Sequence, residues 1–342
     1  MSFTPVAILG ATGMVGQRLI ERLQAHPWFR VEAVAASSRS VGQPYALATA
    51  WRLEGDVPAQ IGALPVLPCE PSAMPPGLRL VISALDAQVA GPIEAAFRAA
   101  GFAVVTNASA FRADPDVPLI IPEVNPDHLC LIERQGPGFI IANANCCAIP
   151  LVMALAPLHR RWGVEALTVS TWQAVSGAGY PGESAWDMVG NVHPHAGNEE
   201  EKLAIEPQKM LGTPTSPAAF PLSARCVRVP VADGHLVGVH VRLSGDPAVE
   251  AVVEAMATWE GEAPPLPSCP RPPLLLTQRR DRPSPRFDAM AHGGMGVTVG
   301  RVERCPVLGV KFYALGHNTI RGAAGAAIAN AELLRATGRL PG

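Results

Sequence analysis

Two adjacent cysteines, Cys146 and Cys147, stand where a thiol can act as a nucleophile. They follow an apolar run at 139–142 and precede an apolar stretch at 151–155 that is typical of a helix. A cysteine at a strand-to-helix turn lies beside the free N–H groups and positive dipole end of the helix, which stabilise a thiolate. The alternative is two small buried side chains without a chemical role, a common fate of intracellular cysteine. The position alone leaves both interpretations open.

Polar side chains that can serve such a nucleophile occur in the second half of the chain. Gln173 ends one alternating run, Arg228 lies on another, and His235 follows a turn. Glu199 and Lys202 are three residues apart in a segment that predicts a helix, so they share one face. A guanidinium can grip a carboxylate with two hydrogen bonds. The structural alternatives are a strand-end arginine, a turn histidine and a glutamate that stabilises a helix dipole.

A glycine pattern near the start of the chain indicates a dinucleotide site. Gly10, Gly13 and Gly16 follow the apolar run 6–9 and open an amphipathic segment. Glycine lets the backbone approach a pyrophosphate, and the N-terminus of the helix binds its charge. The alternative is a tight turn without a ligand. The loop residues expected to contact the cofactor are Gly10, Thr12, Gly13, Met14 and Val15.

The end of the second predicted strand, at 31–36, indicates which cofactor binds. An NAD site usually carries an acidic residue there, which holds the 2′-hydroxyl of the ribose. This chain instead has Ser38, Arg39 and Ser40. Hydroxyls and a guanidinium suit a 2′-phosphate, so the sequence favours NADP over NAD.

The elements that must position these residues fall into two patterns. Up to about residue 143, short apolar runs alternate with helical segments, which predicts right-handed crossovers and a parallel sheet. Beyond that point, alternating runs at 164–172, 225–231 and 238–243 predict a second domain with an open sheet. The expected fold class is α/β, with a Rossmann-type parallel-sheet domain and an α+β second domain.

We expect residues 1–143 to form the NADP-binding domain and residues 144–318 the second domain, which carries the candidate catalytic residues. The alanine-rich C-terminal helix, within 319–342, is expected to pack back onto the first domain. Residues 262–286 are rich in proline and are expected to form an irregular surface loop.

The composition disfavours several classes of partner. The formal net charge is −2, which gives no basic field for nucleic acid. The apolar stretches are shorter than the roughly 20 residues that cross a bilayer, so no membrane is expected. The N-terminus lacks a signal-peptide pattern. Seven cysteines without a ligand-type spacing predict a reduced, cytoplasmic protein without a metal site.

These motifs, in this order, resemble the aspartate-semialdehyde dehydrogenase family, particularly its archaeal and fungal-like branch. The resemblance covers nearly the whole chain, and it rests on the segments 10–16, 116–125, 145–146, 173–182, 199–202, 228–235 and 317–325. It implies NADPH-dependent conversion of 4-aspartyl phosphate to L-aspartate 4-semialdehyde, with release of phosphate. The reaction belongs to the biosynthesis of lysine, threonine and methionine. The family forms homodimers or homotetramers through the sheet of the second domain.

The resemblance also implies residue roles. Cys146 would be the nucleophile that forms a thioester, and Gln173 would orient the acyl-enzyme. His235 would take the thiol proton and later return it, and backbone N–H groups after residue 145 would form an oxyanion site. Substrate contacts would come from Arg228 on the α-carboxylate, Glu199 on the ammonium group, and Lys202 with Arg112 on the phosphate. Ser176, Gly177 and Asn318 would lie beside the cofactor.

Departures from the family pattern at 142–144, 147 and 193–198 and three competing functions remain. The family usually has Ser or Thr where Cys147 stands. An enzyme of the malonyl-CoA reductase type would use the same fold and the same thioester chemistry. N-acetyl-glutamyl-phosphate reductase fits less well because its motifs differ. A redox sensor that binds NADP without turnover would leave Gln173, Arg228 and His235 without roles.

Overall fold

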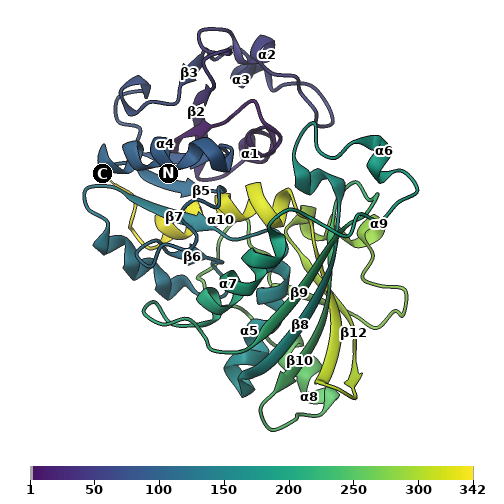
Figure 1. The fold of residues 1–342 in the computed structure, drawn as a ribbon. Coiled ribbons are helices and arrows are strands. Elements are labelled where there is room, and N and C mark those ends of the chain that lie inside the picture. Colours follow the sequence, from purple (N-terminus) through teal and green to yellow (C-terminus); the bar gives the residue numbers. More distant parts are fainter. Residues whose placement is uncertain (1–2, 342) are drawn as a thin grey trace. The chain divides into compact units, whose positions relative to one another are not determined.

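The computed structural model describes residues 3–341, which form two compact units (Figure 1). Within the described range, the first unit contains the chain up to Ile120, the segment His128–Asn143 and the chain from Ala324 onward. The second unit contains Ile121–Asp127 and Ala144–Ala323. Each unit is built around its own sheet.

The first unit contains a parallel sheet of seven strands in the order β3-β2-β1-β4-β5-β7-β6. The strands are β1 (Thr4–Leu9), β2 (Phe29–Ala36), β3 (Val66–Pro68), β4 (Leu80–Ser83), β5 (Ala103–Thr106), β6 (Leu119–Ile120) and β7 (Phe139–Asn143). The central strands β4, β5 and β7 are buried along their whole length, as in parallel sheets covered on both faces. The strand order reverses between β1 and β4, and such a switch point is where open parallel sheets bind ligands.

Helices accompany this sheet. They are α1 (Met14–Leu23), α2 (Tyr45–Ala48), α3 (Ala59–Gly62), α4 (Ala87–Ala99) and α10 (Gly325–Ala336). Although α10 comes from the C-terminus, it packs against β5, β7 and α1. A buried hydrogen bond supports this packing, because Nε2 of His26 lies 2.7 Å from Oε1 of Glu332.

The second unit contains a mixed sheet of six strands in the order β11-β12-β13-β10-β8-β9, and its long strands lie side by side in Figure 1. The strands are β8 (Val164–Gln173), β9 (Leu222–Arg228), β10 (His235–Leu243), β11 (Leu274–Thr277), β12 (Val297–Cys305) and β13 (Gly309–Gly316). Its helices are α5 (Ala148–Trp162), α6 (Ala185–Met188), α7 (Glu199–Leu211), α8 (Val249–Ala257) and α9 (Pro285–Asp288). Helix α5 is buried from its start through Leu158 and packs against β10, β12 and β13.

This architecture confirms the predicted fold class, but three local expectations were wrong or incomplete. The proline-rich segment 262–286 is not wholly irregular, because it contains β11, which pairs in parallel with β12. The hairpin of β12 and β13 has no counterpart among the predicted strands. A π-helical turn, Ile320–Ala324, precedes α10, where a continuous helix was expected.

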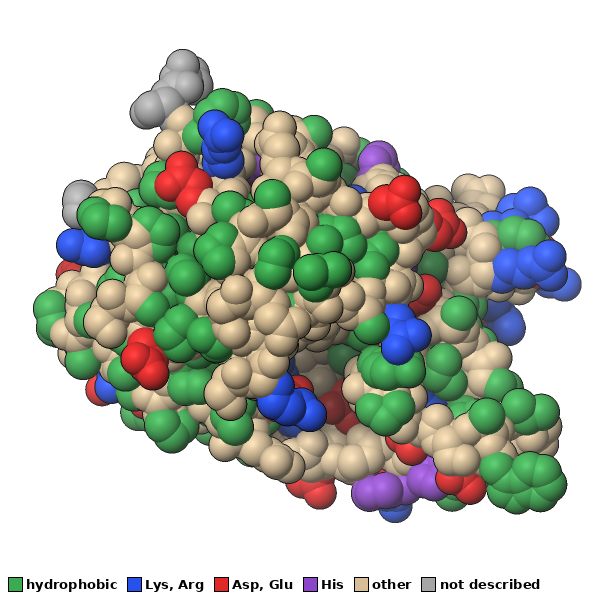
Figure 2. Space-filling view, turned by 90° about the horizontal axis from the view of Figure 1, so that it is seen from above, with side chains coloured by type: hydrophobic (Ala, Val, Ile, Leu, Met, Phe, Trp, Pro, Cys, Tyr) green, Lys and Arg blue, Asp and Glu red, His purple; other side chains and the backbone are tan. Residues whose placement is uncertain are grey.

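The distribution of charge on the surface and the apolar character of the helices concern the expected partners. On the face drawn in Figure 2, basic side chains occur in small groups with acidic and hydrophobic side chains between them. Among residues 3–341, no helix has both the length and the apolar character that a membrane crossing requires.

Candidate active site

The two cysteines lie in the turn that opens α5, and Asn145 organises this turn. The side-chain Oδ1 of Asn145 accepts hydrogen bonds from the N–H groups of Cys147 and Ala148, at 2.9 and 3.3 Å. Asn145 thus satisfies two of the free donors of the helix start. The prediction that backbone N–H groups form an oxyanion site therefore fails for these two donors, which are already bonded.

The two thiols have different environments. Cys147 is fully buried, whereas Cys146 is partly exposed. A hydrogen bond from Cys147, together with the nearby imidazole of His235, holds the pKa of Cys146 well below its ordinary value. Burial and the hydrogen bond with Cys146 raise the pKa of Cys147 well above the usual range. Cys146 is thus the more acidic thiol of the pair, and Cys147 is its hydrogen-bonding partner.

Sheet topology brings Gln173, Arg228 and His235 to one edge of the second sheet. Gln173 and Arg228 are the last residues of the parallel strands β8 and β9, and they are direct register partners. His235 is the first residue of β10, which runs antiparallel to β8. The carboxyl ends of two parallel strands and the amino end of an antiparallel neighbour meet at the same edge. The sheet thereby collects residues that are far apart in the sequence.

Hydrogen bonds fix the side chains at this edge. Nη1 of Arg228 donates to Oε1 of Gln173 and to the carbonyl oxygen of Ala174, both at 3.1 Å. The N–H of Ala174 donates to Nδ1 of His235, also at 3.1 Å. Arg228 and His235 are both buried. Ala174 therefore links the arginine to the histidine through its two backbone groups.

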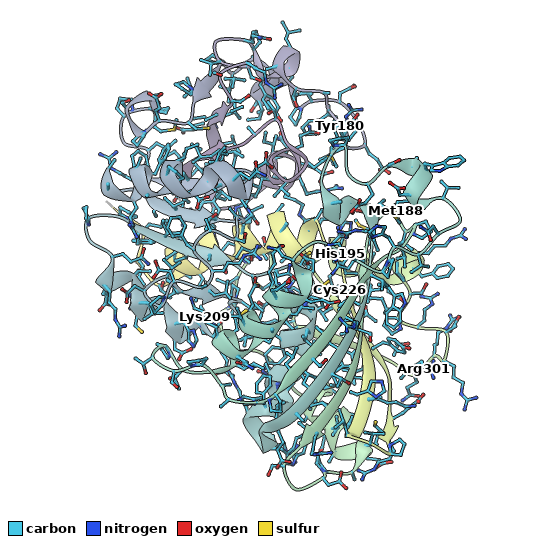
Figure 3. All side chains as sticks on the ribbon, in the orientation of Figure 1. Tyr180, Met188, His195, Lys209, Cys226 and Arg301 are labelled. Carbon is cyan, nitrogen blue, oxygen red and sulfur yellow. The ribbon has the colours of Figure 1, made fainter. Side chains whose placement is uncertain are left out.

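Gly177 was predicted to lie beside the cofactor, and the structure places it against these two side chains. A Cβ atom at this position would lie 2.9 Å from Nη1 of Arg228 and 2.9 Å from Nε2 of His235. Contacts below 3.0 Å are closer than carbon atoms tolerate, so only glycine fits here without a shift. Figure 3 labels His195 and Cys226 near this end of the sheet, where the backbone of His193 pairs with Arg228.

Glu199 and Lys202 lie on one face of α7, as their spacing predicted. Nζ of Lys202 donates to Oε1 of Glu199, and Nδ2 of Asn145 donates to Oε2, both at 2.7 Å. Burial raises the pKa of Glu199, but the Lys202 ammonium and these hydrogen bonds outweigh it and lower the pKa below normal. A second carboxylate, Glu206, accepts the N–H of Asn145 at 2.6 Å. Helix α7 therefore holds Asn145 from two sides.

Ser176 and Asn318, both predicted near the cofactor, share a hydrogen-bond network. The hydroxyl of Ser176 donates to Oδ1 of Asp233 and accepts from Nδ2 of Asn318, both at 2.8 Å. Oδ1 of Asn318 accepts the N–H of Gly234 at 2.8 Å. Asn318 reaches this edge because β13 ends at Gly316.

The sequence missed two supporting residues. Asn145 was noted only as part of a motif, although its side chain accepts N–H groups at the start of α5 and donates to Glu199. Gly322 packs directly on Cys146, because a Cβ there would lie 2.6 Å from the Cβ of Cys146. The run of small residues at 322–325 indicated close packing, but it could not indicate against what.

The glycine loop of the first unit has the shape that a pyrophosphate needs. Gly10 has a φ of +73°, and a Cβ there would lie 2.8 Å from the carbonyl carbon of Ala84. Gly13 is the N-cap of α1 and offers no side-chain acceptor, so the first N–H groups of the helix have no side-chain cap. Thr12, Met14 and Val15 are half-buried around this loop. The glycine loop and the uncapped start of α1 together fit the pyrophosphate of a dinucleotide.

The other predicted contacts of the first unit lie in two loops. Ser38, Arg39 and Ser40 form a turn directly after β2, and Ser38 and Arg39 are exposed. Arg112 lies in the loop that follows β5, where its Nη2 donates to the carbonyl oxygen of Asn107 at 2.8 Å.

Cys146, Cys147 and His235 also form a candidate metal-ligand set, since their ligand atoms lie within 4.8 Å of one another. A metal-bound histidine almost always donates its other ring N–H to an acceptor. Here the other ring nitrogen, Nδ1, instead accepts the N–H of Ala174. His235 therefore lacks the hydrogen-bond acceptor that would face Nδ1 in a metal-bound histidine.

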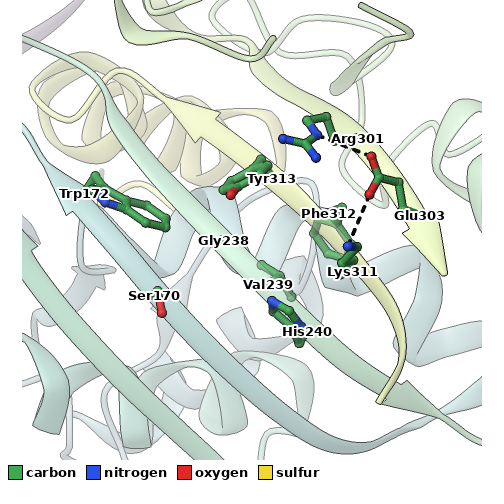
Figure 4. Close-up of a pocket in the computed structure, with 10 residues that line it drawn as sticks. All are labelled: Ser170, Trp172, Gly238, Val239, His240, Arg301, Glu303, Lys311, Phe312 and Tyr313. Atoms are coloured by element: carbon green, nitrogen blue, oxygen red, sulfur yellow. Dashed lines mark hydrogen bonds and ion pairs between the residues drawn. The ribbon is translucent and has the colours of Figure 1, made fainter. Parts of the chain in front are cut away.

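A separate pocket lies on the open face of the second sheet (Figure 4). Trp172, Tyr313 and His240 line it, and Glu303 pairs there with Arg301 and Lys311. Its volume of about 170 Å³ is below the roughly 300 Å³ of common ligand pockets. Gln173, Arg228 and His235 do not line it, so it is not the predicted catalytic site.

Comparisons with known proteins identify the family. Residues 5–132 match the NAD-binding domain of semialdehyde dehydrogenases, and residues 155–321 match the dimerisation domain. An aspartate-semialdehyde dehydrogenase of Archaeoglobus fulgidus is 44% identical, and the match covers 96% of this chain and 97% of the relative. The chain belongs to the aspartate-semialdehyde dehydrogenase family. This confirms the resemblance found in the sequence.

Solved structures agree with this assignment. The aspartate-semialdehyde dehydrogenase of Candida albicans, crystallised with NADP, matches with a TM-score of 0.92 and 39% identity. The match covers 99% of this chain and all of that one. Enzyme II of Vibrio cholerae matches with a TM-score of 0.79 and 28% identity over 98% of this chain and 99% of that one.

Proposed function

We propose that this chain is an NADP-dependent, phosphorylating aspartate-semialdehyde dehydrogenase. It converts 4-aspartyl phosphate to L-aspartate 4-semialdehyde in the biosynthesis of lysine, threonine and methionine. The observation that carries the proposal is a low-pKa thiol, Cys146, next to the buried edge formed by Gln173, Arg228 and His235. The near full-length identity with curated enzymes of this activity supports it.

The thiol performs the covalent step. The thiolate of Cys146 attacks the acyl carbon, which forms an S–C bond and breaks the acyl C–O bond to phosphate. Reduction of the resulting thioester and breakage of its S–C bond release the aldehyde and regenerate the thiolate. NADPH, when bound, supplies the hydride for this reduction. Gln173, held by Arg228, orients the acyl group, and His235 is the hydrogen-bonding partner of the sulfur.

Four charged groups select an amino-acid acyl phosphate. Arg228 binds the α-carboxylate with its fork of donors. Glu199 binds the substrate ammonium, for which its low pKa keeps it ionised. Lys202 binds the phosphate, together with Arg112.

NADP(H) binds at the glycine loop of the first unit. Gly10, Gly13 and the start of α1 hold the pyrophosphate, while Ser38, Arg39 and Ser40 hold the 2′-phosphate. Gly177, Ser176 and Asn318 border the nicotinamide. The NADP complex of the Candida relative supports this choice of cofactor.

The chain carries the dimerisation domain of its family, and we propose a homodimer or homotetramer. The open face of the second sheet is the contact surface. Trp172 and Tyr313 lie there in mutual contact, with ring centroids 6.0 Å apart, and their side chains are only half-buried. A catalytic thiolate also needs a reducing compartment, so we propose a cytoplasmic location.

A malonyl-CoA reductase type of enzyme is not favoured, because the near full-length relatives named above are aspartate-semialdehyde dehydrogenases.

Oxidation of L-aspartate 4-semialdehyde should reduce NADP only when phosphate is present. Malonyl-CoA with NADPH serves as the comparison in the reductive direction. Phosphate-independent oxidation, or faster turnover of malonyl-CoA, would refute the proposed substrate.

A further inference from the structure

Asn145, the residue before Cys146, is held at both its backbone and its side chain. Its carbonyl oxygen accepts the N–H of Ile149 at 3.0 Å, and its side-chain oxygen accepts the N–H groups that open α5. Its backbone N–H donates to Oε2 of Glu206 at 2.6 Å, and its Nδ2 donates to Oε2 of Glu199 at 2.7 Å. The place of Cys146 in the turn is therefore set by the residue that precedes it.

The two glutamates that hold Asn145 differ in what they can reach. Glu199 also pairs with Lys202, whose side chain is 23% exposed, and in the proposed function it binds the substrate ammonium. Its carboxylate is then shared between Asn145 and the substrate. Glu206 lies two turns further along the same face of α7 and is only 4% exposed. Glu206 can therefore hold the backbone of Asn145 whatever Glu199 binds.

Loss of the bond to Glu206 would displace the thiol of Cys146. Asn145 is only 3% exposed, so water cannot easily replace the carboxylate as the acceptor of its N–H. A buried N–H without an acceptor is costly, and the turn would move to relieve it. Cys146 is tightly packed on Gly322, because a Cβ there would lie 2.6 Å from its own Cβ. This packing leaves little room to absorb the movement.

We propose that Glu206 is a positioning residue for the thiol of Cys146. It holds the backbone N–H of Asn145, and through this residue it keeps the sulfur of Cys146 beside Cys147 and His235, whose ligand atoms lie within 4.8 Å of it. Glu206 acts through the turn and does not touch the substrate. Its hold on the turn is a property of the free protein, whereas its effect on turnover rests on the proposed function.

Three variants of α7 separate positioning from the stability of the helix. Glu206→Leu removes the acceptor, and Glu206→Gln keeps one carbonyl oxygen. Gln208→Leu is the control, because it removes a different side-chain hydrogen bond of α7, from Nε2 to the carbonyl oxygen of Phe220 at 2.7 Å. We expect Glu206→Leu to lower kcat by about 10- to 100-fold with KM changed less than about twofold, since a misplacement of about 1 Å has effects of this size. Glu206→Gln should recover most of this loss, and Gln208→Leu should show none.

Alkylation of Cys146 by iodoacetamide reports the position of the thiol without any substrate. A hydrogen bond from Cys147, together with the charge and hydrogen bond of His235, lowers the pKa of Cys146, while burial and the charge of Glu199 oppose this. A displaced sulfur loses these contacts, so the midpoint of alkylation against pH should rise in Glu206→Leu. Loss of a carboxylate by itself would lower the pKa of a nearby thiol, so a simple charge effect has the opposite sign. Glu206→Gln, which also lacks the carboxylate, should not raise the midpoint.

Two results would overturn the proposal. One is an unchanged kcat and an unmoved or lowered alkylation midpoint in Glu206→Leu with retained circular dichroism. The other is an equal loss of activity in Gln208→Leu. If leucine prevents folding, Glu206→Met, with an unbranched apolar side chain, takes its place.

Hydrogen exchange of the wild type, resolved to single residues, needs no variant. We expect the backbone N–H of Asn145 to exchange as slowly as those in the middle of α5, because its acceptor is buried. Fast exchange at Asn145 would refute the hold by Glu206. Alkylation and exchange both remain informative if the proposed reaction is not observed, so a failure of the proposed function is distinguishable from a failure of this inference.

Discussion

At the scale of single residues, the two cysteines have different roles although they are adjacent in the sequence. Asn145 holds the turn, so that Cys146 keeps partial exposure while Cys147 is buried against it. The buried thiol is a donor to the neighbouring sulfur, as a serine hydroxyl would be. The replacement of the usual hydroxyl residue by Cys147 thus preserves a hydrogen bond.

Removal of each thiol separates their roles. Cys146→Ala should lower kcat by at least about 10⁴-fold, because no other group can form the acyl-enzyme. Cys147→Ser should retain most activity, since the hydroxyl still donates to Cys146. Steady-state assays of both proteins, with thermal melts as the folding control, check this. A larger loss of activity in Cys147→Ser than in Cys146→Ala would mean that Cys147 is the nucleophile.

The lowered pKa of Cys146 gives a pH dependence with a definite sign. Thiolate is the reactive form, so the rate of iodoacetamide alkylation at Cys146 should rise with pH and level off above its pKa. We expect the midpoint below the value of about 8.5 for free cysteine. Peptide mass spectrometry follows Cys146 separately from the other six cysteines. A midpoint at or above 8.5 contradicts the assignment.

At the scale of elements, the site depends on where strands end. β8 and β9 stop side by side, β10 begins beside them, and the 3-10 turn Val175–Ala178 folds over this edge. The turn lies so close that one of its residues has to be glycine. The geometry of this edge therefore depends on the backbone as much as on the polar side chains.

Gly177→Ala tests this dependence. The new methyl group would press on Arg228 and His235, and a shift of about 1 Å at such groups lowers kcat/KM by about 100-fold. Gly91→Ala in α4, whose Cβ would be 3.9 Å from its nearest neighbour, is the control. Full activity of Gly177→Ala would show that Arg228 and His235 can shift to accommodate the methyl group without a functional cost.

At the scale of the whole molecule, a buried ion pair joins distant parts of the second unit. Nη2 of Arg321 donates to Oε2 of Glu123 at 2.8 Å, and both side chains are buried. Burial raises the pKa of Glu123, but the charge of Arg321 outweighs it and lowers the pKa. Arg321 precedes Gly322, which packs on Cys146. The pair therefore supports the segment that packs on Cys146.

Glu123→Gln should lower the free energy of unfolding by about 3–5 kcal/mol, because it leaves Arg321 buried without its counter-charge. Urea denaturation measures the change. Glu133→Gln, which alters the exposed pair with Arg339, should change stability by less than about 1 kcal/mol. Similar effects of both variants would contradict a special role for the buried pair. Since the folded-state pKa of Glu123 is depressed, its stabilisation should be lost as pH falls through that value.

Cofactor choice is also a property of the assembled first unit, where the turn after β2 places Arg39 at the surface. Arg39→Ala should raise the KM for NADPH by about tenfold or more, because one charge-assisted contact to the 2′-phosphate is lost. The KM for NADH should change little. Equal effects on both cofactors, or efficient use of NADH by the wild type, would exclude this role.

Much of this molecule was predictable from local patterns. The strand–glycine–helix start, the continuous apolar strands and the thiol turn each reflect neighbours in sequence, because period and turn chemistry act over a few residues. The i, i+3 pairing of Glu199 and Lys202 was predictable for the same reason. β11 was not, because its pairing partner β12 lies about twenty residues further along the chain and its flanking prolines are typical of a loop.

The sequence by itself determined which family the chain belongs to and indicated which residues could carry chemistry, because a motif is recognised from its residue types and their spacing alone. Only the tertiary structure decided how these residues act on one another. The hydrogen bond from Ala174 to Nδ1 of His235, the hydrogen bond from Asn145 to Glu199 and the contact of Gly322 with Cys146 join segments far apart in the chain. Such contacts arise from strand order and helix packing, which no local pattern specifies.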